Sequence, residues 1–513
     1  MRDSLTPPRV RRRHRPPLRR LAGDAALGCI AATGLAPLNL WFLTLPALAL
    51  ILWRIARAPT ARSAFWQALA AGVGWFALAL VWIVEPFLVQ PEVYGWMAPF
   101  ALMLMALGGG LFWAIPAAAA YRLAAPRHAS RIAAIAAALA LSDWLRGWIF
   151  TGFPWALTGH IWIATPVAQS AAVIGATGLS ALTMLLAALP GLLRRRQAEP
   201  ATRALPGAAL CIALTGALWA AGLARLASPL PPDTPITLRV VQPDAQQALK
   251  WDPDWSMKFY RRLLDLSSQP GSPDLVIWPE TAVNFLLNDA DPVLPQMAAS
   301  AGGATLILGI QRAEYPRFFN SLAVVQPDGS ISATYDKFHL VPFGEYIPWG
   351  DALARLGITA FAAQQGNGYS PGPGPTVLSL PGLPEFQPLI CYEAIFPQHL
   401  RTQGPRPAWL LQITNDAWFG RFSGPYQHLA QAQLRAIQSG LPLIRSANTG
   451  VSAIIDAHGT TRASLPLNQM GKIDAALPAA LPATPWWHWG DTPALILLTL
   501  ILTAASLRRR KAA

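Results

Sequence analysis

Charge, cysteine and lysine are all scarce in this chain of 513 residues. Charged residues make up 13% of the sequence, about half of the roughly 25% that is usual for a soluble domain. Hydrophobic residues make up 53%. This composition excludes a disordered chain and argues against an ordinary soluble enzyme. Three cysteines are too few for a scaffold held together by disulfides.

Acidic residues are rarer than basic residues, so the formal net charge is +14. Most of this excess lies at the two chain ends, where residues 1–20 contribute +7 and residues 508–511 contribute +4. The rest of the chain is close to neutral and shows none of the basic clustering that indicates nucleic-acid binding. A nearly neutral, apolar chain with basic ends is instead typical of a membrane protein.

Eight windows are long and apolar enough to predict helices that cross a membrane. The first window is short and follows basic residues, so a signal-peptide core is an alternative for it. A retained helix is favoured, because no clear cleavage site follows and another apolar window begins almost at once. The eight windows are 21–36, 39–56, 64–88, 96–121, 131–150, 167–193, 205–227 and 492–507.

The arginines between these windows predict an orientation. They follow the even-numbered windows, whereas the loops after odd-numbered windows contain few. By the positive-inside rule, both termini are expected in the cytoplasm and the long segment before the last window on the opposite side. The sequence therefore predicts a basic cytoplasmic tail (1–20), seven membrane helices (21–228), an exported domain (229–490), and an eighth helix with a basic tail (491–513).

After the seventh window the pattern changes. Apolar runs of strand length alternate with helical windows such as 254–268 and 425–440. This pattern predicts an α/β domain whose sheets are covered by helices. Polar residues end several of the runs, at Glu280, at Cys391 and at Asn415 with Asp416. Strand ends are where α/β proteins build their sites, so these positions are candidates for chemistry.

Cys391 and Lys337 stand out because their residue types are rare. Cys391 is the only cysteine outside the predicted membrane helices. It is either a buried small apolar side chain or a reactive thiol, and its place at the end of an apolar run favours the second. The chain has 35 arginines and only five lysines. Lys337 therefore indicates a position that needs a compact ammonium group, with an exposed lysine as the alternative.

Three carboxylates accompany these residues. Glu280 ends the run DLVIWPET, Glu345 follows Lys337 in the same segment, and Glu393 comes two residues after Cys391. Taken singly, Glu280 is more simply explained as the start of a solvated turn, and Glu345 and Glu393 are each either surface carboxylates or carboxylates that support a site. The histidines are scattered, and no phosphate-binding loop, dinucleotide fingerprint or GxSxG turn occurs. We therefore expect no metal and no cofactor.

In chain order, Glu280 in WPE, Lys337 in DKFHLVPFGEYIP and Cys391 in ICYE resemble the Glu–Lys–Cys triad of the nitrilase (carbon–nitrogen hydrolase) superfamily. Seven predicted spans before this domain and one after it make the chain similar to the apolipoprotein N-acyltransferase family of the bacterial inner membrane. The resemblance implies eight transmembrane helices and an exported, periplasmic αββα sandwich. Other segments that resemble the family are LKWD at Trp251, FNS at Asn320, DWLRGWIFTGFPW at 143–155 and NDAWFGRFSGPYQH at 415–428.

The resemblance also implies a reaction. An acyl chain moves from the sn-1 position of a phospholipid, chiefly phosphatidylethanolamine, to the N-terminal amine of a diacylglyceryl-apolipoprotein through a thioester on Cys391. Glu280 is expected to be the general base. Lys337 and the backbone N–H of Tyr392 are expected to stabilise the oxyanion. The two lipid-anchored substrates are the expected partners of a monomer. The expected supporting residues are Glu345, Glu393, Tyr392, Trp251 and Asn320.

Two other functions remain open at this level. A membrane-anchored amidase would use the same triad with water as acceptor, although seven preceding spans exceed what an anchor needs. A transporter would explain the spans but not the triad, and it should show more charges at mid-membrane. Asp143 and Arg146 are expected to form an ion pair. The apolar segment 352–363 is expected to be either an arm that reaches the membrane or a buried helix.

Overall fold

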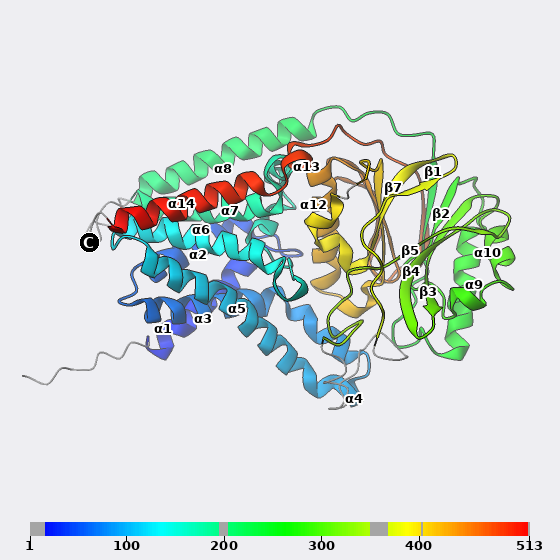
Figure 1. The fold of residues 1–513 in the computed structure, drawn as a ribbon, viewed down its shortest axis with the longest axis horizontal. Coiled ribbons are helices and arrows are strands. Elements are labelled where there is room, and N and C mark those ends of the chain that lie inside the picture. Colours follow the sequence, from blue (N-terminus) through cyan, green and yellow to red (C-terminus); the bar gives the residue numbers. More distant parts are fainter. Residues whose placement is uncertain (1–15, 194–203, 349–367, 402–403, 511–513) are drawn as a thin grey trace, which may run out of the picture.

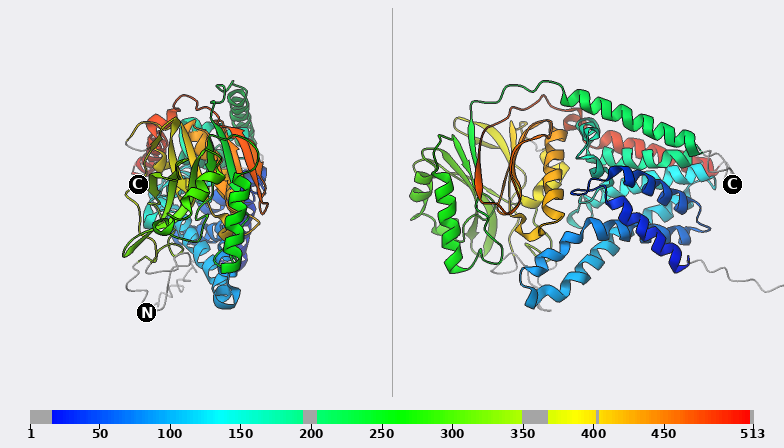
Figure 2. Two further views of the ribbon diagram at one scale, coloured as in Figure 1. Left: turned by 90° about the vertical axis from the view of Figure 1, so that its right-hand side faces the viewer. Right: turned by 180° about the vertical axis from the view of Figure 1, so that it is seen from behind.

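The structure is a computed structural model that describes residues 16–193, 204–348, 368–401 and 404–510. It has two parts, a bundle of long helices and a sandwich of two β-sheets (Figure 1). The chain builds most of the bundle first, then the sandwich, and returns to the bundle for its last helix, α14 (Thr492–Arg510). The C-terminal end of this helix lies at the end of the bundle that faces away from the sandwich (Figures 1 and 2). The predicted apolar segment 352–363 lies outside the described residues.

Each of the eight predicted windows contains a helix. These helices form because a long apolar segment satisfies its own backbone hydrogen bonds only as a helix when water is absent. Two of them are short for a membrane crossing, with 15 residues in α1 and 16 in α2. The helices are α1 (Leu18–Ala32), α2 (Trp41–Ala56), α3 (Ala61–Ala79), α5 (Ala98–Leu123), α6 (His128–Arg146), α7 (Ala171–Leu192), α8 (Leu205–Leu226) and α14 (Thr492–Arg510).

Within the described residues, four helical segments are long and apolar enough to cross a membrane. The number rises to five if α3 and the following 3-10 helix η1 (Val81–Leu88), bent by 49°, form one span. A helical region with several candidate spans is therefore confirmed, while the number eight stays a prediction. The four segments are Pro91–Leu123, Pro166–Leu192, Leu205–Leu226 and Thr492–Arg509.

The sandwich contains two six-stranded sheets with strand orders β12-β1-β2-β3-β4-β5 and β11-β10-β9-β8-β7-β6. In each sheet the three central strands are parallel. The strands are β1 (Thr237–Gln242), β2 (Leu275–Ile277), β3 (Thr305–Glu314), β4 (Arg317–Val325), β5 (Ile331–Asp336), β6 (Leu378–Leu380), β7 (Leu383–Ile390), β8 (Trp409–Thr414), β9 (Leu443–Ala447), β10 (Ser452–Ile455), β11 (Thr461–Leu465) and β12 (Gly471–Ala476).

Apolar side chains from both sheets form one buried layer, to which β1 contributes Leu238 and β8 contributes Leu411. Helices α9 (Pro253–Ser267) and α10 (Leu294–Ser300) pack on the outer face of the first sheet. Helix α12 (Gly424–Ser439) packs on the second sheet and separates it from the helical part (Figure 1). The predicted αββα sandwich and the helical windows 254–268 and 425–440 are thus confirmed.

The ion pair between Asp143 and Arg146 is also confirmed, with 3.1 Å between Arg146 Nη2 and Asp143 Oδ1. Both side chains are buried. Arg146 also donates to the carbonyl of Phe153 at 2.7 Å, and the backbone N–H of Thr158 donates to Asp143 at 2.8 Å. The pair therefore fixes the irregular segment 149–162, which connects α6 to α7 beside the sandwich.

Candidate active site

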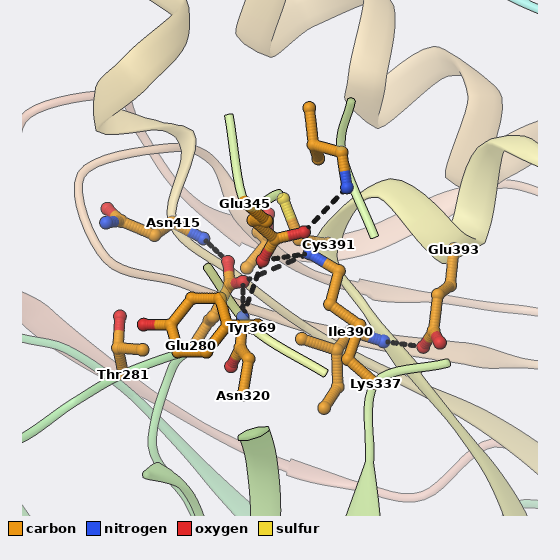
Figure 3. Close-up of polar contacts among 12 residues, drawn as sticks. Glu280, Thr281, Asn320, Lys337, Glu345, Tyr369, Ile390, Cys391, Glu393 and Asn415 are labelled. Atoms are coloured by element: carbon orange, nitrogen blue, oxygen red, sulfur yellow. Dashed lines mark hydrogen bonds and ion pairs between the residues drawn. The ribbon is translucent and has the colours of Figure 1, made fainter. Parts of the chain in front are cut away.

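Glu280, Lys337 and Cys391 come together at the strand ends of the sandwich. Glu280 lies three residues after β2, Lys337 follows β5 directly, and Cys391 follows β7 directly. Figure 3 shows the three side chains pointing toward one another. The structure therefore brings together the three residues that the sequence singled out.

The ammonium group of Lys337 lies between two carboxylates. Its Nζ is 2.9 Å from Glu345 Oε1 and 3.5 Å from Glu280 Oε1. The amide of Asn320 donates to the same two oxygens, at 2.9 Å and 2.7 Å respectively. All four side chains are buried. Burial alone would lower the pKa of Lys337, but Glu345 and Glu280 outweigh it and raise that pKa, so the side chain stays charged.

The second oxygen of Glu280 is held by the backbone. The N–H of Asn415, directly after β8, donates to Glu280 Oε2 at 2.7 Å. Both oxygens of this carboxylate therefore have fixed partners. The side chain is presented at one defined position beside the thiol, as a general base requires.

Lys250 supports the turn after Glu280, a role that was not predicted from the sequence. Its Nζ donates to Thr281 Oγ1 at 2.8 Å and to the carbonyl of Glu280 at 3.4 Å. Thr281 has a φ of 43°, in the left-handed region. Burial lowers the pKa of Lys250 to about 8, although Glu280 opposes the shift. The scarcity of lysine that singled out Lys337 could have found Lys250 as well.

Cys391 sits on a sharp turn between β7 and the 3-10 helix η8 (Cys391–Ile395). Its φ is 52°, a backbone conformation that non-glycine residues rarely adopt and that often marks functional positions. Burial, and then the charge of Glu280, raises the pKa of the thiol, while Lys337 partly offsets them. The resting side chain is therefore a neutral thiol, and its attack on a substrate requires a base.

A buried polar network lies behind this turn. Gln412 Nε2 donates to the carbonyl of Cys391 at 3.2 Å and lies 3.0 Å from His428 Nε2. His428 Nδ1 is 2.9 Å from Asp416 Oδ1. Arg445 donates to Gln412 Oε1 at 2.5 Å and also pairs with Asp416. Within the part of the chain that is described, the network links the Cys391 backbone to four side chains, from β8, the turn after it, α12 and β9.

The neighbouring charges determine which groups of this network are ionised. Burial and Arg445 lower the pKa of His428, so the ring is neutral. Burial would raise the pKa of Asp416, but Arg445 and His428 lower it to about 2. His428 Nε2 lies 3.1 Å from the carbonyl of Cys391 and 3.0 Å from Gln412 Nε2, so both ring nitrogens take part in the network. Asp416 and His428 lie in the segment 415–428 that resembles the family, whereas nothing in the sequence pointed to Gln412 or Arg445.

Glu393 is a buried supporting residue and does not lie on the surface. Its Oε2 accepts from the N–H of Ile390 at 2.7 Å, and its Oε1 accepts from the N–H of Phe338 at 2.8 Å and from Tyr335 Oη at 3.0 Å. It thereby ties the Cys391 turn to the segment that carries Lys337. Burial raises the pKa of Glu393 to about 7, although the N–H donors and Lys337 oppose the shift.

The site adjoins the helical part of the molecule. Tyr392 Oη donates to the carbonyl of Gly152 at 3.0 Å. The ring of Trp155 lies 5.6 Å from that of His428, and its Nε1 donates to Gln427 at 2.6 Å. Segment 149–162 therefore contacts both the turn that carries Cys391, here called the nucleophile turn, and the polar network behind it. Trp251, the residue after Lys250, is half-buried. Its predicted place at a lipid entrance stays a prediction.

The arrangement suits acyl chemistry at a thiol. It contains a nucleophile, a fixed carboxylate and a buried cation for a developing oxyanion. Among the described residues, no group of three or more His, Cys, Asp or Glu side chains is placed to hold a metal ion.

Comparisons with known proteins assign the chain to a family. Residues 27–189 match the apolipoprotein N-acyltransferase N-terminal domain, and residues 244–484 match the carbon–nitrogen hydrolase domain. The apolipoprotein N-acyltransferase of Bradyrhizobium diazoefficiens is 40% identical over 512 residues, which cover 94% of each chain. The chain belongs to the apolipoprotein N-acyltransferase family. It is therefore an acyltransferase, as the sequence predicted.

A second relative agrees with this assignment, and solved structures with lower similarity also match. The apolipoprotein N-acyltransferase of Caulobacter vibrioides is 39% identical and covers 86% of each chain. Among solved structures, a CN-hydrolase superfamily protein from Xanthomonas campestris shares 22% identity over 51% of this chain and 96% of its own, with a TM-score of 0.35. An amidase from Nesterenkonia sp. shares 17% identity over 53% of this chain and 98% of its own, with a TM-score of 0.37.

Proposed function

We propose that this acyltransferase completes lipoprotein maturation. It transfers the sn-1 acyl chain of a phospholipid, chiefly phosphatidylethanolamine, to the N-terminal amine of the S-diacylglyceryl cysteine of an apolipoprotein. Membership of the family supports the two substrates. The observation that carries the mechanism is the buried ammonium of Lys337, held by Glu280 and Glu345 beside the thiol of Cys391.

In the first half-reaction, Cys391 Sγ attacks the ester carbonyl carbon while Glu280 takes the thiol proton. Lys337 and the backbone N–H of Tyr392 stabilise the oxyanion of the tetrahedral intermediate. One such donor is worth about 3–4 kcal/mol in a site that excludes water. The ester C–O bond then breaks, Glu280 returns the proton to the departing lysophospholipid, and the acyl group remains as a thioester.

In the second half-reaction, the α-amino group of the lipoprotein attacks the thioester carbonyl. Glu280 now takes a proton from the amine as the amide bond forms. The C–S bond breaks, and the proton returns to the Cys391 sulfur. The ester of the donor already carries an activated acyl group, so the sequence of steps is balanced without a nucleotide or a metal.

The supporting residues act through the three central ones. Glu345 and Asn320 fix the ammonium of Lys337, and Glu393 fixes the turn that carries Cys391. Tyr392 connects that turn to the helical part, where lipid substrates arrive. Trp251 lines the lipid entrance in this proposal.

The proposal includes a topology. Eight spans place both termini in the cytoplasm and the sandwich in the periplasm, with the sequence divided at 1–20, 21–228, 229–490 and 491–513. The arginine distribution between the windows supports this orientation. Both substrates are anchored in lipid, and the contacts between the nucleophile turn and segment 149–162 support a site at bilayer height. We propose that the enzyme acts as a monomer.

A two-substrate assay tests the reaction. The purified protein is incubated with phosphatidylethanolamine labelled in its sn-1 chain and with a synthetic S-diacylglyceryl-cysteine peptide, and the products are weighed by mass spectrometry. We expect a labelled amide on the peptide, whose formation is lost in Cys391→Ala and kept in the matched control Cys211→Ser. Labelled free fatty acid without labelled peptide would contradict the proposal, because it would show that water is the acceptor.

A further inference from the structure

A groove lies between α3 and α5, at the end of the helices that is far from the active site. The opposite end of α3 leads into η1, where the ring of Trp82 packs 4.8 Å from that of Phe419 in the sandwich. The groove has a volume of about 510 Å³, within the roughly 300–1,000 Å³ of typical ligand sites. It is lined by Ala61, Arg62, Phe65, Trp66, Ile115, Ala118, Ala119 and Arg122.

Two arginines flank the groove. The side chains of Arg62 and Arg122 are exposed, and neither forms an ion pair with a residue that the structure describes. Arg62 lies in the first turn of α3, where the helix dipole disfavours a positive charge. The side chain of Thr60 already caps this turn by accepting from the N–H of Ser63. Helix stability therefore does not explain Arg62, and the two guanidinium groups are available to an anion.

The wall of the groove is apolar. Phe65 and Trp66 form an edge-to-face pair with 5.5 Å between ring centroids. Ile115 is 60% exposed, and Ala118 and Ala119 leave space beside it. The two helices touch further along, where a Cβ at Gly72 would lie 2.8 Å from the Cα of Gly110. The groove opens about two turns beyond that contact.

We propose that this groove binds an anionic glycerophospholipid, with its phosphate between Arg62 and Arg122 and an acyl chain along the apolar wall. Two cations at the rim of an apolar groove fit the charge and the shape of such a lipid. Basic pockets between membrane helices recognise anionic headgroups in this way. The site is separate from the acyl-donor site, which lies at the sandwich end of the helices. A free phosphate would contact only the two arginines and would make no use of the apolar wall.

Native mass spectrometry of the full-length protein in detergent tests this site. The protein is titrated with phosphatidylglycerol, with phosphatidylcholine of the same acyl chains, and with glycerol 3-phosphate. We expect a phosphatidylglycerol adduct that phosphatidylcholine does not match and glycerol 3-phosphate does not displace. Equal retention of the two lipids would overturn the proposal, and so would displacement by glycerol 3-phosphate.

Three variants locate the adduct. Each arginine near a membrane surface contributes about fivefold to binding of an anionic lipid, so Arg62→Gln/Arg122→Gln should weaken phosphatidylglycerol binding by up to about 25-fold. The control Arg57→Gln/Arg127→Gln removes two exposed arginines outside the groove lining and should leave binding unchanged. Ala119→Trp fills the groove, keeps both charges and should also abolish the adduct. Equal losses in the two double variants, or full binding by Ala119→Trp, would show general surface attraction and overturn the proposal.

Discussion

Both parts of this acyltransferase bury charged side chains, but they balance the charges differently. In the helical part, Asp143 and Arg146 pair one to one, and their remaining polar atoms contact backbone groups of segment 149–162. At the active site, Glu280 and Glu345 share the single ammonium of Lys337. Asp143 and Arg146 balance each other and fix the fold, whereas two carboxylates that share a cation beside a thiol are typical of a functional site.

The largest expected effect comes from Glu280→Gln, which equalises the charges of the cluster. We expect acyl transfer to fall by at least about a thousandfold, because the base is lost. The charge of Glu280 raises the pKa of Cys391, so the same variant should lower that pKa. Alkylation of the thiol by iodoacetamide across pH measures it. Retained activity, or a thiol pKa that rises, would show that Glu280 is not the base beside Cys391.

The second prediction tests whether the buried pair of Asp143 and Arg146 stabilises the fold and takes no part in the reaction. Asp143→Asn leaves Arg146 buried without its counter-ion, which should lower the free energy of unfolding by about 3–5 kcal/mol. Thermal unfolding in detergent measures the loss. Acyl transfer per folded molecule should fall less than tenfold. A variant that stays fully stable and loses its activity would place this pair in the reaction.

Lys337→Met removes the cation from the cluster. We expect kcat to fall by about two to three orders of magnitude, which corresponds to the loss of one oxyanion donor worth about 3–4 kcal/mol. Lys337 lowers the pKa of Cys391, so the variant should raise it, opposite to Glu280→Gln. Lys258→Met, at an exposed lysine on α9, is the matched control and should change neither quantity. A shift of the thiol pKa in the same direction in both active-site variants would contradict this account.

The smallest effect is expected behind the nucleophile. Gln412→Met removes the amide that holds the carbonyl of Cys391 and should reduce kcat about tenfold, with KM nearly unchanged. Gln412→Asn, which keeps an amide on a shorter side chain, should recover part of the loss. A change in KM alone would show that Gln412 acts on substrate binding and does not position Cys391.

The sequence predicted the central strands and the triad because both carry local signals. Buried parallel strands are continuous apolar runs, and Lys337 and Cys391 belong to rare residue types. Edge strands such as β11 (Thr461–Leu465) and β12 (Gly471–Ala476) were not predicted, because they are half-exposed and contain no apolar run. Such a strand is defined by the strand with which it pairs. In β12, for example, Ala476 lies opposite Thr237 of β1.

The residues that position the triad were missed for a related reason. Gln412 and Arg445 lie inside β8 and β9, where their side chains meet only because these strands are neighbours in the sheet. Lys250 reaches Thr281 across about thirty residues of sequence. Contacts between distant segments leave no periodic pattern, so only the folded chain shows them.

Trapping the acyl-enzyme tests the central claim most directly. The protein is incubated with sn-1-labelled phosphatidylethanolamine and no acceptor, digested, and analysed by mass spectrometry at all three cysteines. We predict a labelled acyl group on Cys391 that hydroxylamine removes and that disappears when the diacylglyceryl peptide is added. A folded, lipid-bound protein that makes labelled peptide but never carries label on Cys391 would contradict the mechanism.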